Sequence, residues 1–147
     1  MQGVALMEQG VREAMAGIAA SPQRRMTPFV LLVDHGKVVH LTSQRDAADA
    51  LAFFRQAIRP RPGTTDYVLI WDGVMAEFHP DRPGADGDRA VFAEMGDDRL
   101  PDATVMAYRF AIKEPGLFRR KRELVIKDNT LIYAAAPSRI FPGPQAS

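Results

Sequence analysis

Cysteine is absent from the 147-residue chain, and no run of apolar residues approaches the length of a membrane span. The first absence excludes disulfide bonds, thiolate nucleophiles and zinc sites with sulfur ligands. The second excludes a transmembrane helix, which needs about 20 apolar residues. The beginning of the chain also lacks the basic and apolar regions of a secretory signal. We therefore expect a cytoplasmic protein with no membrane partner.

Motifs of the common catalytic and cofactor sites are missing as well. No serine stands in a G-x-S-x-G pattern, which argues against covalent acyl transfer. Neither G-x-G-x-x-G nor the P-loop pattern occurs, so a nucleotide-binding fold has no support. The acidic loop 81–88 does not match the spacing of a calcium loop. The sequence predicts no cofactor.

The composition is that of a folded domain. Hydrophobic residues make up 46% of the chain and charged residues 25%, close to the average of globular proteins. A chain of this length buries roughly two-thirds of its unfolded surface around one core. We expect a single domain over residues 1–141, followed by a flexible tail at 142–147.

Two amphipathic helices are predicted in the N-terminal half. Apolar residues recur every three or four positions between residues 4 and 19, and Ser21-Pro22 ends this pattern. A second helix is expected after Ser43, a suitable N-cap, and it ends before the Pro- and Gly-rich segment 59–63.

The remaining apolar segments predict strands. Three of them break at turn signals and are expected to form hairpins: 29–41 around residues 34–37, 67–78 around Asp72-Gly73, and 123–135 around Asp128-Asn129. Further strands are expected at 90–95 and 104–113. The predicted fold class is α+β, with two N-terminal-half helices packed on one face of a mainly antiparallel sheet of about seven or eight strands.

Three strings in the second half resemble segments of small uncharacterised bacterial proteins with strand-turn-strand segments. They are Trp71-Asp72-Gly73, Asp88-Arg89-Ala90 and Ala107-Tyr108-Arg109-Phe110-Ala111. This resemblance implies no activity and no functional residue. The order helix, two strands, helix, strands is also similar to the roadblock and profilin-like scaffolds, which implies dimerisation or partner binding.

The expected hairpin around Asp72-Gly73 predicts an interaction surface. The pairing of its two strands turns one set of side chains toward the core and places Val68, Ile70 and Met75 on the other face of the sheet. With two helices on one side of the sheet, this apolar face has no cover within the chain, and a second subunit could supply it. The leading hypothesis is a protein-interaction or scaffold module that homo-oligomerises and could also bind another protein.

Charge asymmetry between neighbouring segments would help to orient such subunits. Residues 72–102 contain nine acidic and three basic residues, whereas residues 103–127 contain seven basic and two acidic residues. Opposite charges across an interface guide orientation and weaken with salt.

A metal-dependent or acid-base enzyme is the alternative from another class. In the expected hairpin, Asp66, Glu77 and His79 meet at one end of a face, and such a cluster suits a divalent metal or proton transfer. No second ligand motif accompanies this cluster. A solvated strand end without a functional role is therefore favoured over a metal or catalytic site.

Nucleic-acid binding is the third hypothesis. It would use the basic cluster Arg119, Arg120, Lys121 and Arg122, with Phe118 available for base stacking. A net charge of +1 argues against it, because nucleic-acid binders usually present a broad basic surface. A charged connection between two strands is the favoured interpretation.

Overall fold

The computed structural model of the chain describes residues 2–42, 47–58, 63–75, 88–99, 102–118 and 121–138. In this part of the chain the elements are, in order, α1 (Gln2–Ala20), β1 (Phe29–Asp34), β2 (Lys37–Thr42), α2 (Ala47–Ile58), β3 (Thr64–Val74), β4 (Arg89–Asp97), β5 (Asp102–Lys113) and β6 (Glu123–Pro137). The fold is α+β, with both helices in the N-terminal half, as the sequence predicts.

The strands form one antiparallel sheet in the order β2-β1-β3-β4-β5-β6. From β3 onward each strand pairs with the next one along the chain, and β2 and β6 form the two edges among the described strands. The strands predicted at 90–95 and 104–113 are confirmed as β4 and β5.

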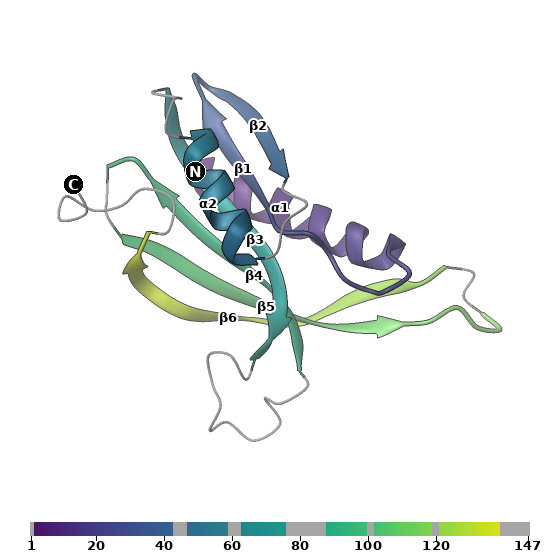
Figure 1. Ribbon diagram of the computed structural model, residues 1–147. Helices are drawn as coiled ribbons and strands as arrows, with labels where there is room; N and C mark the ends of the chain where they lie inside the picture. Colours follow the sequence, from purple (N-terminus) through teal and green to yellow (C-terminus); the bar gives the residue numbers. More distant parts are fainter. Residues whose placement is uncertain are drawn as a thin grey trace.

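The two helices lie on opposite faces of the sheet, so the prediction that both cover one face is wrong (Figure 1). The α1 helix packs around Leu31 of β1, and α2 packs around Leu32. Successive strand residues point to opposite faces, which separates the two helices. The β1 run Phe29–Val33 is buried throughout, as expected of a strand covered on both sides.

The first predicted hairpin is confirmed. Asp34 of β1 pairs with Lys37 of β2, which leaves His35 and Gly36 as a two-residue turn. Both have positive φ, 51° and 79°, the pattern of the type I′ turn that matches strand twist. His40 lies opposite Leu31, as the predicted register requires.

The other two predicted turns are wrong. Asp72 and Gly73 lie inside β3, where they pair with β4, and Asp128 and Asn129 lie inside β6, where they pair with β5. Residues 67–74 therefore belong to one long strand, as do residues 123–135, whereas 76–78 lie outside the described residues. The described sheet has six strands rather than seven or eight. The two aspartates bind arginines of neighbouring segments instead of closing turns.

The Gly36→Val substitution should lower the free energy of unfolding by about 1–2 kcal/mol, because an L side chain is strained in the left-handed region. Gly116→Val is the matched control, since its added atoms meet open space and its φ is not positive. Thermal unfolding of both variants checks this. Equal melting temperatures for the two variants would contradict the turn assignment.

Candidate functional site

One residue of the predicted metal cluster, Asp66, lies in the described part of the chain. Asp66 lies in β3 opposite Asp97 of β4, and its carboxylate accepts a hydrogen bond of 2.9 Å from the Thr65 hydroxyl. Glu77 and His79 lie outside the described residues. Within the described ranges, no three His, Asp or Glu side chains are grouped so that they could hold a metal ion. The three-residue cluster stays a prediction.

The predicted interface residues are buried in the chain's own core, which corrects the expectation of an uncovered face. Val68, Ile70 and Met75 are 0%, 0% and 1% exposed. The α1 helix covers Val68 and Ile70, whereas Met75 packs in a different cluster, with Phe92. The face assignment failed because it depended on a turn at Asp72-Gly73 that the strand does not make.

The predicted basic cluster is divided. Arg119 and Arg120 lie outside the described residues, and Lys121 is exposed. Arg122 points inward, where its Nη1 donates hydrogen bonds to the carbonyl oxygens of Ala19, at 3.1 Å, and Ser21, at 2.8 Å. Carbonyls at the end of a helix have no partner within the helix. Arg122 therefore caps α1 and is not available as a surface cation.

Glu114 completes this anchor between the β5–β6 connection and α1. Its carboxylate accepts a hydrogen bond from Arg24 Nε at 2.7 Å and another from Arg122 Nε at 3.1 Å. The hydrogen bond from Arg24 holds the pKa of Glu114 below its usual value, and the charges of both arginines add to this effect. The carboxylate is therefore ionised at neutral pH.

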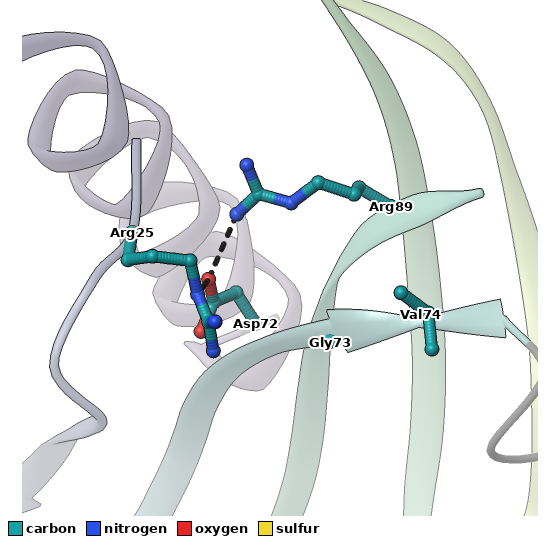
Figure 2. A pocket seen from close by; sticks show the side chains of 5 residues that line it. All are labelled: Arg25, Asp72, Gly73, Val74 and Arg89. Carbon is teal, nitrogen blue, oxygen red and sulfur yellow. Dashed lines mark hydrogen bonds and ion pairs between the residues drawn. The ribbon is translucent and has the colours of Figure 1, made fainter. Parts of the chain in front are cut away.

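Sequence reasoning missed a cluster in which two arginines converge on Asp72 (Figure 2). The carboxylate of Asp72 is 4% exposed, and its Oδ2 lies 2.8 Å from Arg25 Nε and 3.0 Å from Arg89 Nη2. Arg25 follows α1, Asp72 belongs to β3, and Arg89 begins β4. The pair Asp72-Gly73 predicts a turn from local preference, and that prediction hid the strand that positions the Asp72 carboxylate.

A cavity of about 370 Å³ adjoins this cluster and is lined by Arg25, Asp72, Gly73, Val74 and Arg89. The Arg89 guanidinium also lies 5.1 Å from the centre of the Phe110 ring, a cation–π distance. Arginine stays protonated in proteins, so neither guanidinium can exchange a proton with a substrate. The cluster has no acid-base pair, and its contacts tie the segment after α1 to β3 and β4.

A second polar cluster lies inside the core. The hydroxyl of Tyr67 donates to Glu94 Oε2 at 2.5 Å and lies 2.6 Å from Ser138 Oγ. All three residues are buried. A Cβ on Gly96 would come within 2.7 Å of the Tyr67 ring, so this glycine lets the ring lie against β4. Because these groups are enclosed, the cluster stabilises the core and presents no reactive group to solvent.

The acidic and basic segments of the second half meet within the chain. Arg109 Nη1 lies 2.7 Å from Asp88, Arg109 Nη2 lies 2.9 Å from Asp128, and Lys127 lies 3.7 Å from Asp88. The hydrogen bond with Asp128 raises the pKa of Arg109 above its ordinary value. Part of the charge asymmetry is therefore neutralised internally and does not reach a partner.

Strand β6, at the outer edge of the sheet, carries one group of exposed apolar side chains. Four of its large apolar side chains are between 37% and 51% exposed: Val125, Ile126, Leu131 and Tyr133. Most other residues of this strand are exposed as well.

No protein family, curated protein or solved structure matches this chain. Function is therefore inferred from the arrangement of the described residues. Neither described helix is long and apolar enough to cross a membrane.

Asp72→Asn should lower the free energy of unfolding by about 1–2 kcal/mol, because it removes a buried charge that two arginines bind. Glu13→Gln is the control, since the Glu13–His40 pair is far more exposed than Asp72, at 40% and 44%, and should contribute within about 0.5 kcal/mol. Urea unfolding measures both. Similar losses for the two variants would show that the Asp72 cluster is an ordinary surface pair.

Tyr67→Phe should destabilise the fold by about 1–3 kcal/mol, because the buried Glu94 carboxylate loses a hydrogen bond. Tyr108→Phe is the control, as the Tyr108 hydroxyl makes no hydrogen bond with a described residue. The measurement is the urea concentration at the midpoint of unfolding, compared between variants whose unfolding free energies depend equally steeply on urea. A Tyr67→Phe protein as stable as Tyr108→Phe would rule out a stabilising role for this cluster.

Proposed function

We propose that the protein is a non-enzymatic interaction module that forms a homodimer through the outer edge of β6. The observation that carries this proposal is the 15-residue length of β6 at the edge of the described sheet, together with its four partly exposed large apolar side chains. An edge strand presents backbone donors and acceptors that another strand can bind. We place this dimer in the cytoplasm.

A second copy of the chain fits this edge by symmetry. Antiparallel pairing about a two-fold axis brings the same strand against itself, so the edge needs to be complementary only to itself. Register shifts against β5 leave 128–131 as the regularly paired central segment of β6. Two exposed apolar residues lie on either side of Asp128-Asn129, Ile126 before this pair and Leu131 after it. Pairing centred between them places Ile126 of one copy beside Leu131 of the other.

Among the described residues, the polar clusters give neither alternative support. In the described clusters, the Asp72 carboxylate is bound by two arginines and Glu94 is enclosed, so neither offers an accessible acid-base group. Arg122 caps a helix, and Arg109 and Lys127 lie beside acidic side chains. These three basic side chains therefore bind groups of the protein itself, which leaves them less available to a nucleic acid.

Leu131→Asp should weaken dimerisation at least tenfold, about 1.4 kcal/mol or more, because it places a charge in the proposed interface. Val38→Asp is the matched control, since Val38 is 52% exposed on β2, the opposite edge strand. Light scattering over a concentration series measures the mass of each protein. A monomeric wild type at high micromolar concentration, or equal weakening by both substitutions, would contradict the proposal.

A further inference from the structure

The connection between β5 and β6 carries the most exposed large apolar side chains of the described chain. Leu117 is 91% exposed and Phe118 is 98% exposed, whereas the next most exposed, Val38, is at 52%. The two residues are adjacent in the connection between β5 and β6, two strands that extend beyond the rest of the sheet (Figure 1). Two neighbouring side chains of this size in water are costly unless another surface covers them.

The stem of this hairpin is fixed to the body of the protein. Glu114, three residues before Leu117, binds Arg24 after α1, and Arg122, on the returning side, caps the last turn of α1. These contacts hold the base of the hairpin against the end of α1.

The sequence on both sides of Leu117 and Phe118 is rich in basic residues. Residues 113–122 contain five basic residues and one acidic residue. Arg122 and Glu114 belong to the anchor, but Lys113 and Lys121 are exposed on the two arms. Arg119 and Arg120, outside the described residues, directly follow Phe118 in the sequence.

We propose that the tip of this hairpin docks on an anionic lipid surface, with Leu117 and Phe118 inserted at the boundary of headgroups and acyl chains. This proposal replaces the expectation of no membrane partner, which rested on the lack of a spanning segment; docking at the surface needs none. Stable membrane association generally needs two signals, and an apolar insertion next to basic residues supplies both. An aliphatic side chain next to an aromatic one suits hydrocarbon, whereas a single nucleic-acid strand would use the ring for stacking and leave Leu117 uncovered. The docking requires one copy of the chain and goes beyond dimerisation.

Vesicle sedimentation with the full chain tests the proposal. The wild type should sediment with vesicles of equal parts phosphatidylcholine and phosphatidylserine, and at least tenfold less with phosphatidylcholine alone. The double variant Leu117→Ser/Phe118→Ser should reduce binding to the anionic vesicles at least tenfold. Val38→Ser should bind like the wild type. All three side chains are exposed, so the variants should fold normally, which thermal unfolding verifies.

Phe118→Trp adds a direct readout, because indole emission shifts to the blue when the ring enters an apolar layer. The shift is expected with anionic vesicles. Leu131→Asp should retain vesicle binding, which separates this proposal from dimerisation. The proposal is overturned by no binding to anionic vesicles, by equal binding to both vesicle types, or by binding that survives the double serine substitution. Binding to a single-stranded oligonucleotide but not to vesicles would assign the tip to nucleic acid and equally overturn it.

Discussion

Burial of β1 on both faces is the constraint on which the rest of the architecture depends. Five consecutive apolar residues, Phe29–Val33, cannot be covered from one side, so the chain places α1 on one face and α2 on the other. The α2 helix packs over β1 and β3, whereas α1 packs over β1, β3 and β4 and reaches β6 near its start, at Leu124. The strand farthest from β1 in the sheet order, β6, is consequently left with large apolar side chains in solvent.

Two strands continue through positions where the local sequence favours a turn, and at both positions an aspartate forms ion pairs with another segment. Asp72 and Asp128 each belong to a pair that favours a turn in isolation, and each instead binds arginines from other segments. Pairing with a neighbouring strand along the whole length satisfies more backbone groups than an early turn does. Tertiary contacts therefore override the local preference at both positions.

The sequence predicts the elements better than their arrangement. Helical periodicity located both helices, and the turn at His35-Gly36 was found because positive φ at both central residues is a local property. The faces of the sheet were missed, although the unbroken run in β1 was a readable sign of burial on both sides. The Asp72 cluster could not be predicted, since its arginines are 47 and 17 residues away along the chain.

The cap on α1 also has consequences for how the chain folds. Arg122 reaches carbonyl oxygens of Ala19 and Ser21 that lie 103 and 101 residues earlier. During synthesis, α1 is made before Arg122, so the carbonyl oxygens at its end lack this partner until the connection between β5 and β6 follows. Closing so long a loop is slow compared with forming a helix. The cap on α1 therefore forms only after the connection between β5 and β6 has been made.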